Sequence, residues 1–173
     1  MTRRAERRQA ATLPLVSHTL WQSDWFTVPK MSPNMNLRTI TAIPSVFHVE
    51  DAGDPRFYIF ATLTSGVLRF EVVARMLDGG RGSVTGKEFF AAMMAHFGGR
   101  INLIESKWSA TSGMTTNLDL VNRATASGMS IEDAATLTWT GRRASDFGFG
   151  QVLGVQSTGN AGTYQIVRVQ FGR

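Results

Sequence analysis

The spacing of the apolar residues changes along this chain, from every second residue to every third or fourth and back again. LRTITAI (37–43) and SVFHVE (45–50) alternate apolar and polar residues, as strands do. RFYIFATL (56–63) and VLRFEVVARM (67–76) alternate in the same way. Between them, Thr64-Ser65-Gly66 supplies the glycine that a tight hairpin connection needs. These segments predict a run of antiparallel strands.

Helical spacing begins near residue 85. Thr85 and Glu88 form a T-x-x-E capping box, in which the hydroxyl and the carboxylate satisfy free N–H groups at a helix start. Gly98-Gly99 is a stop signal. The apolar residues between these signals follow helical spacing: Phe89, Phe90, Met93, Met94 and Phe97. We therefore expect a helix over residues 85–97.

The rest of the chain predicts a strand, two helices and a closing hairpin. INLIESKW (101–108) is the strand, and the helices run from Thr116 to near Gly128 and from Ser130 toward Gly141. QVLGVQ (151–156) and TYQIVRVQF (163–171) form the hairpin. This order predicts an α+β fold, an antiparallel sheet with two to three helices packed mainly on one face. We expect a single globular domain over residues 36–173.

Composition excludes several classes of protein. The 173 residues contain no cysteine, which excludes a disulfide scaffold, a cysteine nucleophile, zinc fingers and cysteine-ligated zinc deaminases. No apolar run approaches the roughly 20 residues of a membrane span. The net charge is +5, and residues 1–8 supply +3 of it through four Arg and one Glu. We interpret residues 1–35 as a basic, irregular arm. Its apolar stretch is too short and broken for a secretory signal, which favours a cytoplasmic protein.

Phosphate-loop and metal chemistry have little support. The segment GGRGSVTGK (79–87) lacks the spacing of a phosphate-binding loop, so we interpret it as a glycine-rich connection into the helix. A looser hypothesis is that Gly86 and Lys87 favour an anion at the helix start. His18, His48 and His96 are far apart in sequence, so we expect no metal and no cofactor. Glu105-Ser106-Lys107 matches half of a metal-dependent nuclease motif without its partner carboxylate, and we interpret it as a solvent-facing strand.

Metal-free acid–base chemistry is the remaining hypothesis for catalysis. Ribonucleotide cleavage needs a general base, a general acid and cations near the phosphorus. We predict His96, Glu105 and Lys107 as catalytic residues, assembled if the helices pack over the 101–108 strand. The alternative for His96 is a histidine at a helix C-terminus that interacts with the helix dipole.

The segment TLTWTGRRASDFGFG (136–150) combines hydroxyls, a tryptophan and paired arginines, which suits base stacking and phosphate contact. The alternative for Trp139 is a core residue that anchors a helix bend at Gly141. The predicted substrate-binding residues are Arg100, Thr138, Trp139, Thr140, Arg142 and Arg143.

Residues from about 82 to 173 resemble the C-terminal toxin modules of bacterial polymorphic toxins of the Rhs and haemagglutinin types. The matching segments are GKEFFAAMMAHFG, NLDLVNRATASGMS, AATLTWTGRRASDFGF and a closing G-x-Y-x-x-V-x-V-x-F. The resemblance covers about half of the chain, and residues 1–80 have no part in it. It implies an effector delivered into a target cell, with an immunity or delivery protein as partner. It carries no catalytic residues over to this chain.

We therefore expect an effector-like domain that acts on nucleic acid, as a metal-independent ribonuclease with RNA or another phosphate-bearing ligand. The alternative is a non-catalytic module that binds protein or nucleic acid. An enzyme that acts on NAD is less favoured, because no pair of glutamates lies near the closing strands.

Overall fold

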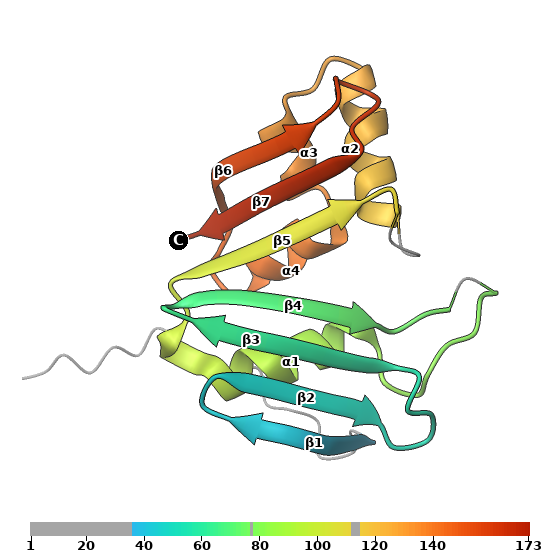
Figure 1. The fold of residues 1–173 in the computed structure, drawn as a ribbon, viewed down its shortest axis with the longest axis vertical. Coiled ribbons are helices and arrows are strands. Elements are labelled where there is room, and N and C mark those ends of the chain that lie inside the picture. The colour runs from blue at the N-terminus through green and yellow to red at the C-terminus, as the bar shows by residue number, and fades with distance from the viewer. Residues whose placement is uncertain (1–35, 77, 112–114) are drawn as a thin grey trace, which may run out of the picture.

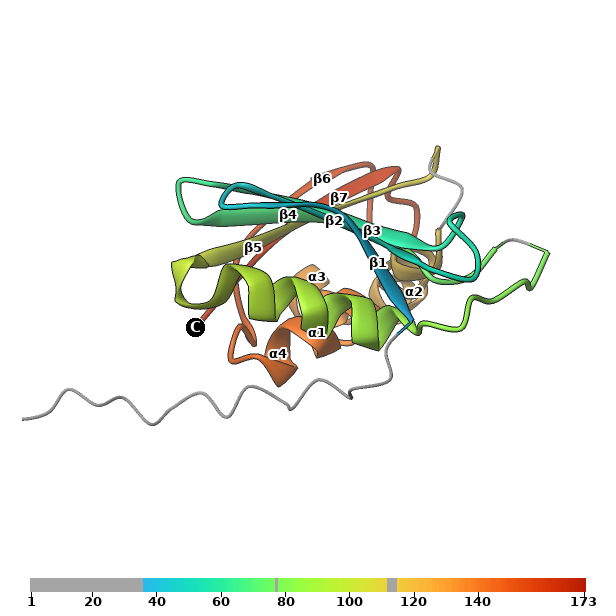
Figure 2. The ribbon, with the colours of Figure 1, turned by 90° about the horizontal axis from the view of Figure 1, so that it is seen from below.

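The computed structural model describes residues 36–76, 78–111 and 115–173, which form a seven-stranded sheet in the order β1-β2-β3-β4-β5-β7-β6 (Figure 1). Among these described residues, all four α-helices lie on one side of the sheet, and no described helix covers the other side (Figure 2). The strands are β1 (Leu37–Ile43), β2 (Val46–Asp51), β3 (Tyr58–Thr64), β4 (Val67–Val73), β5 (Leu103–Ser109), β6 (Gln151–Thr158) and β7 (Ile166–Gly172). The helices are α1 (Gly86–Phe97), α2 (Thr116–Ala126), α3 (Ile131–Thr136) and α4 (Trp139–Asp146), with a short 3-10 turn, η1 (Gly98–Arg100).

The predicted α+β fold is confirmed. The predicted strands and both hairpins are present, and every neighbouring pair of strands is antiparallel except β4 and β5. Those two run parallel because α1 carries the chain back between them. The predicted arm, residues 1–35, lies outside the described residues.

The hairpin between β3 and β4 turns where the sequence predicted. Ser65 and Gly66 both have positive φ angles, 50° and 78°, which is the backbone of the tight turns that match strand twist. The carbonyl of Gly66 also accepts the N–H groups of Asn102 and Leu103, at 2.8 and 3.1 Å. This turn therefore holds the start of β5 beside β4.

The predicted capping box is present at the start of α1. The Thr85 hydroxyl accepts from the Glu88 N–H at 3.3 Å, and the Glu88 carboxylate accepts from the Thr85 N–H at 2.7 Å. The helix buries Phe89, Phe90, Met93 and Phe97 against the sheet. The apolar face predicted from the sequence is thus the face that packs.

The prediction of one helix from Ser130 toward Gly141 is wrong. The chain forms two helices, α3 and α4, because Thr138 leaves helical geometry (ψ 163°) and caps α4 by accepting the Gly141 N–H at 3.0 Å. Gly141 lies against the end of α3: a Cβ there would be 2.3 Å from the Ala135 carbonyl oxygen. The glycine therefore permits close packing between the two helices and does not bend one of them.

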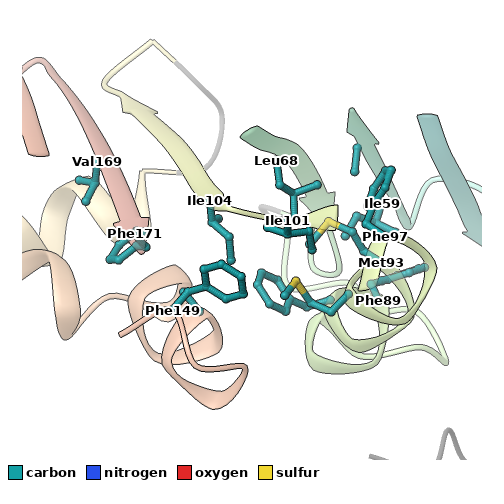
Figure 3. Close-up of a cluster of buried hydrophobic side chains, with 14 of the residues drawn as sticks. Ile59, Leu68, Phe89, Met93, Phe97, Ile101, Ile104, Phe149, Val169 and Phe171 are labelled. Carbon is teal, nitrogen blue, oxygen red and sulfur yellow. The ribbon is translucent and has the colours of Figure 1, made fainter. Parts of the chain in front are cut away.

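The core lies between the sheet and the helices and extends from β2 to β7 (Figure 3). Phe89, Met93 and Phe97 fill the part under β2 to β4, and Phe149 fills the part under β5 and β7, beside Phe171. Because aromatic and aliphatic side chains are buried continuously from Ile59 to Val169, the described residues form one domain.

Two buried polar contacts fix the loops that frame this core. The Asp51 carboxylate, 1% exposed, accepts the N–H groups of Gly53 (2.9 Å) and Val84 (3.0 Å) and the N–H and hydroxyl of Ser83. The Asn122 amide accepts the Tyr164 N–H at 2.7 Å and donates to its carbonyl at 3.0 Å. The first contact ties the segment before α1 to β2, and the second ties the β6–β7 loop to α2.

Candidate functional site

His96 and Arg100 hold the end of α1 against the turn between β1 and β2. The His96 ring stacks on Phe47, with ring centroids 4.8 Å apart, and its Nε2 lies 3.0 Å from the Ile43 carbonyl oxygen. The Arg100 guanidinium donates to the carbonyls of Phe97 (3.1 Å), His96 (3.0 Å) and Pro44. These contacts give both side chains a role in the fold on the helix-covered side of the sheet.

Glu105 and Lys107 point to the opposite side of the sheet. On β5 the alternate residues Ile104 and Trp108 are buried under the helices, so Glu105 and Lys107 face the side without helices. The backbone of β2, β3 and β4 lies between this position and His96. The structure therefore does not bring the three predicted catalytic residues together.

The tryptophan segment packs inward. Thr138 and Thr140 are 0% and 3% exposed, and the Trp139 ring meets Phe90 edge-on at 5.9 Å. The Asn117 side-chain amide accepts a hydrogen bond from the backbone N–H of Trp139 at 3.0 Å and donates one to the Thr140 hydroxyl at 3.1 Å. These three predicted substrate-binding residues join α2 and α4 to the core, which fits the alternative of Trp139 as a core residue.

Arg142 and Arg143 line an open depression of about 380 Å³ beside α4, on the helix side. Arg143 forms an ion pair with Asp146 at 2.8 Å, so only Arg142 of the two is solvent-exposed and without an ion pair among the described residues. The depression also includes Thr136, Gly141, Ser145 and Gly150. It lies on the other side of the sheet from Glu105 and Lys107.

Three successive backbone N–H groups of the glycine-rich connection before α1 already have acceptors within the protein. The N–H groups of Ser83 and Val84 donate to Asp51, and that of Thr85 donates to Glu88. Hydrogen bonds from Gly53, Val84 and Ser83 outweigh the effect of burial and lower the pKa of Asp51. The Asp51 carboxylate thus takes the place that an anionic ligand would occupy in this segment.

We use the term open face for the side of the sheet that has no helix. Its most distinctive feature is the aromatic group formed by His48, Tyr58 and Phe60 on β2 and β3. The His48 ring meets Tyr58 and Phe60 edge-on, at 5.9 and 5.7 Å between centroids. Phe60 is 41% exposed, although it lies in the middle of a central strand. Sequence reasoning did not single out this group. The sequence does contain a signal for it: His48, Tyr58 and Phe60 alternate with the buried residues Phe47, Val49 and Ile59, which places these three rings on the side of the sheet away from the core.

The open face also carries a cation pair, Lys107 on β5 and Arg168 on β7. These residues are direct cross-strand partners, both are exposed, and neither has an ion pair among the described residues. Gln156 lies opposite Arg168, and one row away lie Gln170 and Glu105, whose pKa is lowered in part by the charge of Arg168. Two like charges face each other here with no carboxylate in their own row.

Arg69 and Glu105 separate the aromatic group from the cation pair. Arg69 Nε donates to Glu105 Oε1 at 2.6 Å, and the Gln170 amide donates to Glu105 Oε2 at 3.2 Å. The hydrogen bond from Arg69 is the main cause that lowers the pKa of Glu105, and Gln170, the charge of Arg69 and the charge of Arg168 lower it further. Glu105 is therefore held ionised within this network.

In residues 36–76, 78–111 and 115–173, no three His, Asp or Glu side chains lie together as a metal site would require. Among the same residues, no helix has the length and apolarity to cross a membrane. We compared the chain with protein families, curated proteins and solved structures, and none of them matched.

Proposed function

We propose that this protein is a nucleic-acid-binding module that holds single-stranded RNA on the open face of its sheet. One observation carries the proposal: exposed aromatic rings and two cations that form no ion pair among the described residues share the side of the sheet that no described helix covers. Unstacked bases bind to aromatic side chains on sheets, and the phosphates between them bind to nearby cations.

The aromatic group supports the stacking part of the proposal. A planar apolar ring that is 41% exposed on a central strand is costly in water, and a stacked base removes it from solvent. The edge-on contacts with His48 hold the Phe60 and Tyr58 rings in place. Each base stacked in this way contributes about 1–3 kcal/mol to binding.

The cation pair supports the phosphate part. Like charges directly opposite each other on neighbouring strands destabilise a sheet. A phosphate placed between Lys107 and Arg168 turns this repulsion into two attractions. The aromatic rings lie on β2 and β3, and the cations lie on β5 and β7 of the same sheet. Neighbouring strands are about 5 Å apart, so one short oligonucleotide can reach both the rings and the cations.

This proposal follows the non-catalytic alternative and makes no use of His96. With His96 on the other side of the sheet from Glu105 and Lys107, the acid–base set expected for a ribonuclease is not assembled. The resemblance of residues 82–173 to polymorphic-toxin modules supports a bacterial effector as the setting for RNA binding. An immunity protein is then the protein partner that we propose.

The test is fluorescence anisotropy of a labelled, unstructured RNA of about nine nucleotides with the full chain in EDTA. Phe60→Ala should weaken binding about tenfold through lost stacking. Lys107→Gln with Arg168→Gln should lower the slope of log Kd against log salt by about 1.4, because a single strand releases about 0.7 counterion per phosphate contact. Arg142→Gln, on the helix side, is the matched control and should change little. All variants keep the basic arm, so its contribution cancels.

Three outcomes would overturn the proposal. Equal binding by the wild type and by all open-face variants that retain a normal thermal melt would assign RNA binding elsewhere. No binding to any RNA would leave the protein-binding alternative. A denaturing gel of the same samples reports cleavage. RNA that is cut by the wild type in EDTA would support a metal-independent ribonuclease in place of a non-catalytic module.

A further inference from the structure

One carboxylate on the open face lies beside the ring that we expect to stack a base. Glu71 on β4 is the direct cross-strand partner of Phe60 on β3. Both side chains leave the sheet on the open face, and Cβ atoms of such partners are typically about 5 Å apart. Glu71 is exposed. A base stacked on Phe60 therefore has one edge within reach of the Glu71 carboxylate.

Glu71 differs from the other two carboxylates of the open face. Glu50 forms an ion pair with Arg38, and Glu105 forms one with Arg69. No ion pair involves Glu71 in the part of the chain that the structure describes. Glu71 interacts with Tyr58, whose pKa is raised by burial and then by the charge of Glu71 and a hydrogen bond to it. Glu71 is thus an exposed carboxylate beside the aromatic group, without an ion pair among the described residues.

The chemistry of an ionised carboxylate selects among the bases. A carboxylate only accepts hydrogen bonds, and its two oxygens match two parallel N–H donors. Guanine offers such a pair, N1–H and N2–H, on its Watson–Crick edge. Adenine and cytosine offer one amino group each beside a ring-nitrogen acceptor. Uracil offers one N–H between two carbonyl oxygens, which repel a carboxylate.

We propose that Glu71 is a specificity-determining residue that selects guanine for the position stacked on Phe60. The inference rests on the proposed function, since it needs a base on the open face. The inference assigns different parts of the ligand to different strands. The rings and the carboxylate on β3 and β4 contact the base, and the cation pair on β5 and β7 contacts the phosphates. Lys107 and Arg168 lie on strands away from Phe60, so the phosphates and the base have separate partners.

The experiment uses labelled RNA nonamers of uridine with one central position changed to guanosine, inosine, adenosine, cytidine or left as uridine. The full-length wild type should bind the guanosine oligonucleotide about tenfold more tightly than the all-uridine one, the size of one bidentate contact. Inosine, which lacks the N2 amino group, should fall between them. Glu71→Gln should reduce the guanosine preference to about twofold or less while still binding RNA. Glu132→Gln, an exposed glutamate on α3, is the control and should keep the preference.

The outcomes separate the two proposals. Equal affinity of the wild type for all five oligonucleotides, or a guanosine preference that Glu71→Gln retains, overturns the role of Glu71 and leaves RNA binding intact. Absence of binding to every oligonucleotide overturns the proposed function itself. A thermal melt of Glu71→Gln like that of the wild type shows that the change acts on the ligand and not on the fold.

Discussion

Arg69 Nε donates a hydrogen bond of 2.6 Å to Glu105 across the parallel pair that joins the two halves of the sheet. β4 and β5 pair through three residue positions, from Val67 with Leu103 to Arg69 with Glu105. The Glu105 carboxylate also accepts from Gln170 on β7, so it connects three strands on the open face. The short backbone junction is thus reinforced by one side-chain network between the aromatic group and the cation pair.

A double-mutant cycle on this pair should give a coupling of about 0.5 kcal/mol, because both partners keep solvent contact and are screened. Arg69→Gln, Glu105→Gln and the double variant are compared by urea unfolding at low salt and at high salt. The coupling should shrink at high salt. Because the pKa of Glu105 is lowered in the fold, its contribution is present above the ordinary carboxyl pKa and is lost as pH falls through the lowered value. Additive single effects at low salt would show that the pair does not couple.

Asp51→Asn should destabilise the fold by about 3 kcal/mol at neutral pH. The buried carboxylate accepts hydrogen bonds from three backbone N–H groups and the Ser83 hydroxyl. The NH₂ group of an asparagine would face these donors, so some of the buried hydrogen bonds would be lost. Chemical denaturation measures the loss. Asp54→Asn, in the following turn and in a solvent-screened ion pair with Arg56, should change stability far less than Asp51→Asn does.

The pH dependence gives a second check on Asp51. Its pKa is lowered in the fold from an ordinary 3.8, so the folded state releases this proton more readily than the unfolded state. The stabilisation is therefore complete above the ordinary value and is lost as pH falls through the lowered one. The gap between the wild type and Asp51→Asn should narrow on acidification. A gap that stays constant below pH 3.8 would contradict the assignment.

His96→Ala should lower stability by about 2 kcal/mol, from the lost ring stacking on Phe47 and the lost contact with the Ile43 carbonyl. RNA affinity should not change, since the imidazole lies on the helix side. Denaturation and anisotropy on the same variant separate the two effects. Unaltered stability together with lost cleavage of RNA would instead support the catalytic role that the sequence predicted.

The strands and hairpins were predictable because their signals are local. Alternation from Leu37 to Met76 and the Ser65-Gly66 turn depend on neighbours in sequence, and so does the Thr85 capping box. The break between α3 and α4 was not predicted. From sequence alone, Thr138 could serve as a cap or as a helix residue. The deciding contact is long-range within this segment: Gly141 packs so closely on α3 that a Cβ at this position would lie 2.3 Å from the Ala135 carbonyl oxygen.

The candidate site was harder to predict for a topological reason. Period-2 alternation separates Glu105 and Lys107 from Ile104, but it does not say which side of the sheet receives the helices. The predicted catalytic set required the helices to pack over the 101–108 strand and so to bring His96 to Glu105 and Lys107. In the structure α1 covers Leu68 and Ile59, so the strand residues that alternate with them, among them Phe60, Arg69 and Glu71, lie on the open face.

Removing the Glu71 charge should make the Tyr58 hydroxyl easier to ionise. Burial is the largest cause that raises the pKa of Tyr58, and Glu71 adds to it, so Glu71→Gln should move that pKa down but not to the ordinary value of 10.0. The chain has two tyrosines, and a Tyr164→Phe background leaves Tyr58 as the sole source of tyrosinate absorbance. Glu132→Gln is the control and should not shift the titration. A Tyr58 titration that is the same with and without Glu71 would mean that the carboxylate does not lie above the aromatic group. The proposed contact with guanine would then lose its geometric basis, whatever the RNA-binding measurements gave.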